Sequence, residues 1–124
     1  MGAIAFSRKP DESWVVAGWA FRQVLDDVAS QHPEDSEMAK EFEEAKAISG
    51  LIVYKLRPGL AARVTGAIRE VATGILSSTI QSGIVTQPYG DERAVREYRK
   101  GLRQLLDAMP STEIPGGWPT LPRS

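Results

Sequence analysis

Apolar residues recur three and four positions apart through most of this 124-residue chain. That spacing is typical of amphipathic helices, which bury one face. Prolines divide the pattern into four intervals, at Pro10, Pro33, Pro58, Pro88 and Pro110. Because proline disrupts a helix interior but is tolerated in the first turn, each interval can hold one helix. The pattern therefore predicts four helices.

We expect the first helix over residues 11–31, where acidic residues follow Pro10 and can cap the helix. The second is expected over 34–56. Its second half, 48–56, is rich in β-branched apolar residues and is also compatible with a strand. We favour a helix there because the sequence shows no second strand to pair with it.

The third helix is expected from Pro58 to about residue 83, and the fourth over 91–109, with Asp91 as its N-terminal cap. The third carries a second apolar line, Leu76, Ile80 and Ile84, opposite its main stripe. A helix that is apolar on both sides is central in a bundle or lies at a subunit contact.

These elements predict an all-α fold. We expect residues 1–110 to form a four-helix up-and-down bundle, with residues 111–124 as an extended, Pro-rich C-terminal tail. The tail carries three large apolar residues, Ile114, Trp118 and Leu121. Because a disordered linker is usually poorer in such residues, we interpret the tail as a docking element, on its own bundle or on a second chain.

Composition excludes several kinds of chemistry. The chain has no cysteine, which excludes disulfides and thiolate sites, and its only histidine is His32, expected as a cap at a helix end. The net charge is −1, so charge indicates neither a nucleic acid nor a membrane partner. No apolar run resembles a signal peptide or a membrane span, and we expect a cytoplasmic protein without catalytic residues, metal or cofactor.

Charge is divided between two helices. The second begins with an acidic stretch in which Glu37, Glu41 and Glu44 share one face. We interpret this row as a solvated face near a helix N-terminus, although it has the residue type of a cation site. The fourth carries a basic stripe, for which the acidic stretch is one candidate partner, within the chain or across a dimer.

Two residues of the first helix, Val15 and Trp19, fall outside its core stripe. With the second line of the third helix, they provide more apolar surface than one bundle core needs, which indicates a contact with another chain or with the tail. The candidate interface consists of Val15, Trp19, Leu76, Ile80, Arg96, Arg99, Arg103, Ile114, Trp118 and Leu121.

The C-terminal quarter combines Tyr98-Arg99 and Leu102-Arg103 with a later Trp118-Pro119, and in this pattern it resembles phage tail-fibre and tail assembly chaperone proteins. Those proteins end in a helix of the form Tyr-Arg-x-x-Leu-Arg, followed by a Pro-rich run with Trp-Pro. The matching residues here are Tyr98, Arg99, Leu102, Arg103, Trp118 and Pro119. The resemblance implies a role in phage tail assembly.

From the residues themselves, we expect a non-enzymatic interaction protein that works through helix surfaces and binds a protein partner, most simply itself. Two alternatives remain. One is the phage tail assembly protein that the resemblance implies. The other is a small helical ligand-binding protein or enzyme, with an apolar pocket between helices and acids of the second helix at its mouth.

Overall fold

A three-stranded sheet overturns the prediction of an all-α four-helix bundle. The computed structural model, which describes residues 1–110, contains four α-helices and a mixed sheet. The helices are α1 (Gly18–Gln31), α2 (Ser36–Ile48), α3 (Pro58–Leu76) and α4 (Glu92–Ala108). The strands are β1 (Gly2–Ala5), β2 (Ser13–Val16) and β3 (Gly50–Ile52). Three short 3₁₀ turns also occur in the described residues: η1 (Pro10–Glu12), η2 (Val53–Lys55) and η3 (Gly83–Thr86).

The sheet has the strand order β2-β1-β3. The central strand, β1, runs antiparallel to β2 and parallel to β3, with Ile4 opposite both Trp14 and Leu51. These three side chains are buried and form the inner face of the sheet. Because side chains alternate along a strand, those of Ala3 and Val15, which lie opposite each other, point to the other face.

The first predicted helix begins seven residues too early, since residues 13–16 form β2 and α1 starts at Gly18. The predicted continuation of the second helix to residue 56 is also wrong. Ser49 adopts the left-handed conformation (φ 58°), which ends α2 and turns the chain into β3. The missing partner strand is β1, whose Ala3 N–H donates to the Ser49 carbonyl at 3.2 Å.

The predicted helix ends that depend on capping are confirmed for α3 and α4. Pro58 opens α3, and the Asp91 carboxylate caps α4 by accepting from the Ala94 N–H at 2.8 Å. However, α3 ends at Leu76 rather than near residue 83. The chain reverses there and the Ile80 N–H donates back to the Gly74 carbonyl at 3.0 Å, so the predicted second apolar line is not helical.

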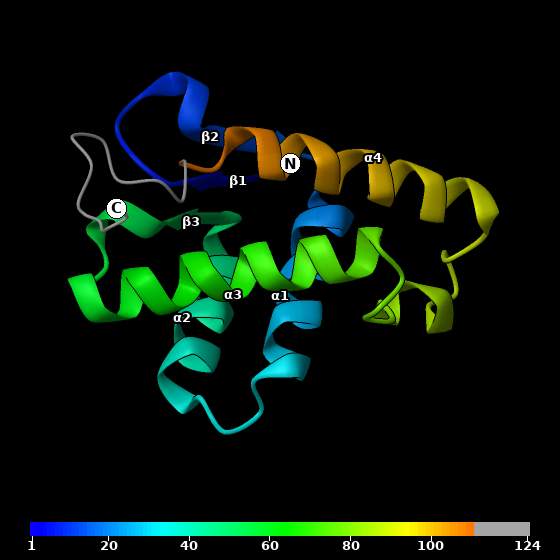
Figure 1. Ribbon diagram of the computed structural model, residues 1–124, viewed down its shortest axis with the longest axis horizontal. Coiled ribbons are helices and arrows are strands. Elements are labelled where there is room, and N and C mark those ends of the chain that lie inside the picture. Colours follow the sequence, from blue (N-terminus) through cyan, green and yellow to red (C-terminus); the bar gives the residue numbers. More distant parts are fainter. Residues whose placement is uncertain (111–124) are drawn as a thin grey trace, which may run out of the picture.

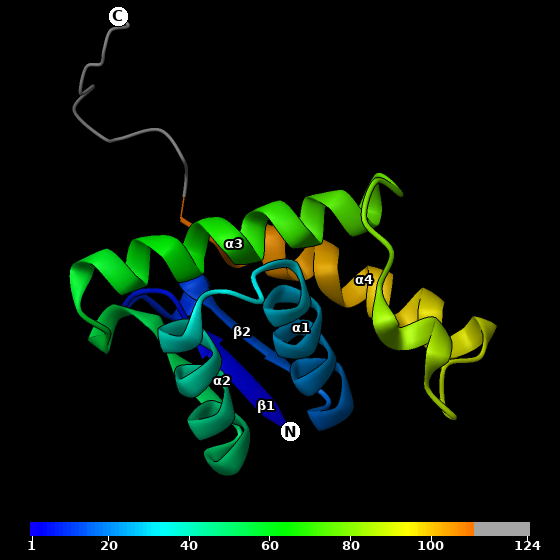
Figure 2. The same ribbon diagram turned by 90° about the horizontal axis from the view of Figure 1, so that it is seen from below.

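The helices share one core with the sheet (Figures 1 and 2). In Figure 1, α3 crosses the middle of the molecule and α4 lies along it, whereas α1 and α2 form an antiparallel hairpin that is clearest in Figure 2. Among the side chains with almost no exposed surface are Phe21, Leu25, Ile68 and Leu105 from α1, α3 and α4. The sheet packs on this core through β1 against α1 and β2 against α4.

Within residues 1–110, no helix combines the length and the apolar character needed to cross a membrane. The tail residues proposed for docking, Ile114, Trp118 and Leu121, lie outside the described part of the chain.

The buried sheet gives the first prediction. Ile4 is 0% exposed between two strands and the helices, so Ile4→Ala should lower the free energy of unfolding by about 2–5 kcal/mol. Ile48→Ala removes the same atoms from a side chain that is 74% exposed, and it should change the free energy of unfolding by less than about 0.5 kcal/mol. Urea denaturation measures both. Equal effects would show that Ile4 is not in the core.

Candidate interaction surface

An open groove of about 690 Å³ lies between α4 and the segment that joins β2 to α1. Its floor is apolar and is contributed by Val16, Ala17, Trp19, Ala20, Ala94 and Gly101. Trp19 is only partly buried there, and its ring lies 5.7 Å from the ring of Tyr89 and 6.3 Å from that of Tyr98. Trp19 therefore belongs both to the core and to an accessible surface, whereas the sequence placed it outside the core.

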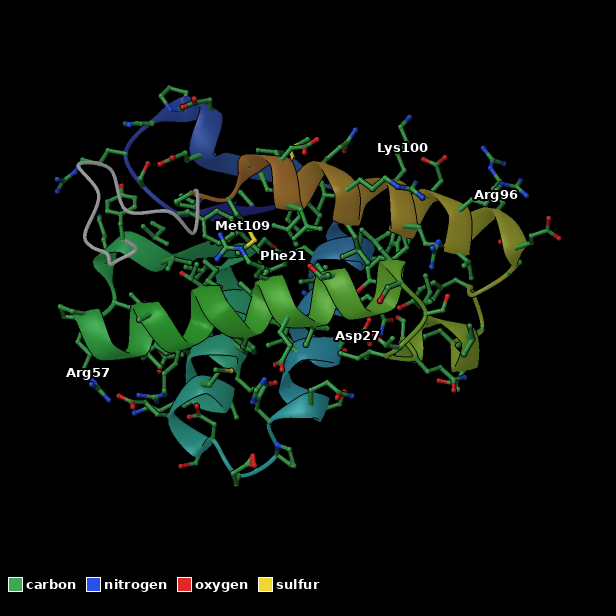
Figure 3. The ribbon with its side chains drawn as sticks, in the orientation of Figure 1. Phe21, Asp27, Arg57, Arg96, Lys100 and Met109 are labelled. Carbon is green, nitrogen blue, oxygen red and sulfur yellow. The ribbon has the colours of Figure 1, made fainter. Side chains whose placement is uncertain are left out.

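The rim of this groove carries charges of both signs, from Asp91, Arg93, Glu97 and Lys100. Figure 3 shows Lys100 and Arg96 projecting outward from α4. Within the described residues, neither Arg93 nor Lys100 forms an ion pair. The rim thus offers free charge beside an apolar floor.

The predicted basic stripe of α4 divides into three roles. Arg99 is partly buried and donates to the carbonyls of Ile75 and Leu76 at 2.9 and 2.8 Å, so it caps the C-terminus of α3. Arg96 pairs with Glu92 of its own helix at 2.8 Å. Arg103 is exposed and has no ion-pair partner in residues 1–110. Of the three predicted interface arginines, Arg103 is therefore the freest to meet a partner.

The acidic stretch of α2 does not pair with α4 in the described structure. Glu37 instead accepts hydrogen bonds from Arg57 and Arg63, and Asp35 pairs with Arg63 at 3.2 Å. The bond from Arg57 is the larger cause that lowers the pKa of Glu37 to about 2, and the bond from Arg63 adds to it. The start of α2 is thus tied to the start of α3.

Glu37, Glu41 and Glu44, the row predicted on one helix face, line one side of a second hollow of about 440 Å³. Its other walls combine apolar residues, among them Leu51, Leu56 and Leu60, with the two bases Lys55 and Arg57. Residues 1–110 contain no group of three acidic or histidine side chains arranged to hold a metal ion. His32 lies at the C-terminal end of α1, as the sequence predicts, with its side chain 3.3 Å from Glu70.

A buried carboxylate that the sequence analysis missed lies behind the groove. Asp27 of α1, 4% exposed, accepts four hydrogen bonds. The hydroxyls of Ser82 and Tyr98 donate to Oδ2 at 2.5 and 2.7 Å, and the Gly83 N–H and the Gln23 amide donate to Oδ1 at 2.9 and 3.0 Å. Burial and the Asp27 charge raise the pKa of Tyr98, which keeps it a donor. One feature of the sequence could have indicated this burial: Asp27 follows Val24 by three residues and so lies within the apolar stripe of its helix.

The remaining predicted interface residues are dispersed. Val15 is 58% exposed on the outer face of β2, not on a helix. Leu76 and Ile80 pack partly buried against the core at the far end of α3. The structure therefore brings Val15 and Trp19 near one end of β2 and leaves Leu76 and Ile80 in another region.

The second prediction concerns the buried carboxylate. Asp27→Ala leaves four donors without their acceptor and should lower the free energy of unfolding by about 2–5 kcal/mol. Its neighbour Asp26 is exposed and pairs with Lys46, so Asp26→Ala should change stability by about 0–1 kcal/mol. Thermal and urea denaturation compare the two. If Asp26→Ala were as harmful as Asp27→Ala, the Asp27 network would not be central to stability.

The third prediction follows from the lowered pKa of Glu37. Its stabilising contribution is fully present above the ordinary pKa of 4.5 and is lost as the pH falls through about 2. The urea concentration at the unfolding midpoint should therefore decrease when the pH is lowered from 5 to 2.5, an interval that covers most of this titration. The decrease should be smaller in Glu37→Gln. Glu34→Gln, at an exposed carboxylate without an ion pair in residues 1–110, is the control. An unchanged pH dependence in Glu37→Gln would contradict the assignment.

Comparison of the chain with models of known protein families, with curated protein sequences and with solved structures gives no match. A function must therefore be argued from the surfaces of the molecule. Three of them have been described: the groove at Trp19, the acidic hollow beside α2 and the exposed strand β2.

Proposed function

We propose that this chain is a non-enzymatic interaction protein that self-associates through the groove at Trp19 and the adjoining strand β2. The observation that carries this proposal is the groove itself, an apolar floor with a partly buried tryptophan and a charged rim on which Arg93 and Lys100 form no ion pair within residues 1–110. Interface centres are enriched in aromatic residues and in arginine, and their rims are polar.

The charges of the chain support a second copy as the partner. Bases on α4, Arg93, Lys100 and Arg103, have no ion pair in the described structure, and the same is true of acids such as Asp11 and Glu41. Charges of both signs that form no ion pair within residues 1–110 can pair with each other in a symmetric assembly, where each contact occurs twice. We place this assembly in the cytoplasm, in keeping with the lack of cysteine.

The resemblance to phage tail assembly chaperones is a further proposal within the same class. Part of its motif has a structural reason here, since Tyr98 and Leu102 are buried and Arg99 caps α3. Its Trp118-Pro119 portion lies outside the described residues.

A small-molecule binding protein is the second candidate, and one observation favours it. The hollow beside α2 combines apolar walls with Glu41 and Glu44, as a pocket for an apolar cation would. Of the two bases that also line it, Arg57 is paired with Glu37, which leaves Lys55 as the competing cation. Titration with alkylammonium ions while the tryptophan and tyrosine fluorescence is recorded would test this candidate. Saturable binding that Glu41→Gln weakens would support it over self-association.

The fourth prediction tests self-association. Sedimentation equilibrium of the full chain should give a dimer mass whose fraction grows with protein concentration. Lys100→Glu should weaken the dimer about ten-fold at low salt and less at high salt, because salt screens exposed charges. The control is Lys40→Glu, the same charge reversal on α2, which should not weaken the dimer. A wild-type chain that stays monomeric up to millimolar concentration would overturn the proposed function.

A further inference from the structure

β2 is an edge strand whose outer side carries free backbone groups. Within residues 1–110, it has a neighbour, β1, on one side only. The Phe6 N–H donates to the Glu12 carbonyl at 2.9 Å, just beyond the pair Ala5–Ser13, so residues 6 and 12 occupy a hydrogen-bonded position of the antiparallel register, although the Glu12 N–H itself donates to the Lys9 carbonyl. Hydrogen-bonded and non-hydrogen-bonded pairs alternate along an antiparallel ladder, so Ser13 and Val15 occupy non-hydrogen-bonded positions. Their N–H and C=O groups are therefore directed away from β1.

Apart from its short length of four residues, this edge lacks the devices that usually block strand addition. Natural sheets protect their edges with proline, charged side chains or bulges. The residues of β2 are Ser13, Trp14, Val15 and Val16, none of which is charged or proline, and its pairing with β1 has no bulge. The exposed Val15 adds an apolar side chain next to the free backbone groups.

We propose that β2 pairs antiparallel with β2 of a second copy, with Val15 opposite Val15 of that copy. This inference rests on the proposed self-association and specifies which residues meet in the dimer. The two Val15 residues exchange their free N–H and C=O groups, and Ser13 of each copy lies opposite Ala17 of the other. The two sheets become one continuous sheet of six strands, and the exposed Val15 side chains cover each other.

Charge complementarity favours a second copy over an unrelated strand. In this register, residues before Ser13 of one copy run past Ala17 toward Trp19 of the other. The rim of that groove carries two acids, Asp91 and Glu97, and two bases, Arg93 and Lys100. Asp91 already accepts the Ala94 N–H as the cap of α4, whereas neither base forms an ion pair within residues 1–110, so the bases are the groups that an arriving acid can pair with. The residues that arrive there are Asp11 and Glu12 of the acidic turn η1. Neither has an ion pair within residues 1–110, and the two-fold symmetry repeats the contact.

Disulfide trapping tests the register directly, since the chain has no cysteine of its own. Directly opposed residues of a hydrogen-bonded antiparallel pair have Cα atoms about 5.5 Å apart, within the range that a disulfide spans. Val15→Cys should therefore form a covalent dimer under mild oxidation about ten-fold faster than Ile48→Cys, whose site on α2 is more exposed. Equal rates for the two variants would overturn the proposed pairing.

A second pair of variants separates this inference from the proposed function. Val15→Pro removes the outward backbone N–H without removing a hydrogen bond to β1. Val15→Thr keeps this N–H and has a side chain of similar shape. We expect Val15→Thr to dimerise like the wild type and Val15→Pro to be monomeric with unchanged helical circular dichroism.

The outcomes are distinguishable. A monomeric wild type overturns both proposals. A dimeric wild type with an equally dimeric, folded Val15→Pro variant overturns only the strand pairing. If Val15→Pro does not fold, amide exchange of the wild type decides, because the Val15 N–H must become protected as the protein concentration rises, and a fast exchange at all concentrations contradicts the pairing.

Discussion

The position of the groove depends on one buried carboxylate. An isolated charge in a protein interior is strongly unfavourable, so Asp27 requires donors, and it takes them from α1, from the start of η3 and from α4. Tyr98, which donates to Asp27, also lies against Trp19, and Tyr89 donates to Gln23 in the same network. The anion thereby fixes the distance between α1 and α4, and with it the walls of the groove.

The sequence predicted those parts of the fold that depend on local chemistry. Pro58 and Asp91 mark helix starts through their own conformational and capping properties, and α3 and α4 begin where expected. The strands were missed because each has three or four residues, too few to show alternation, and because residues 6–49 separate β1 from β3 along the chain. Asp27 was hidden for a related reason: the donors that make its burial tolerable come from distant segments.

The candidate site was predictable only in part, because exposure depends on which element a residue joins. Val15 was expected on a helix face, and it is exposed instead through strand alternation. Arg99 was grouped with Arg96 and Arg103 by helical spacing, yet the end of α3 lies where its guanidinium can reach two free carbonyls. A periodic stripe thus identifies a shared direction on a helix, but the neighbouring elements decide which member is structural.

The sheet and the groove form one surface because β2 leads directly into α1. Val16 ends the strand, Ala17 is the N-cap residue of α1, and both line the groove, so a segment that extends the sheet at β2 must pass over Trp19. Backbone pairing alone fixes little beyond direction, since every strand offers the same N–H and C=O groups. Trp19 and the charges on the rim add the selectivity that the backbone lacks. Only a strand whose flanking residues can contact Trp19 and pair with the rim charges gains from both surfaces.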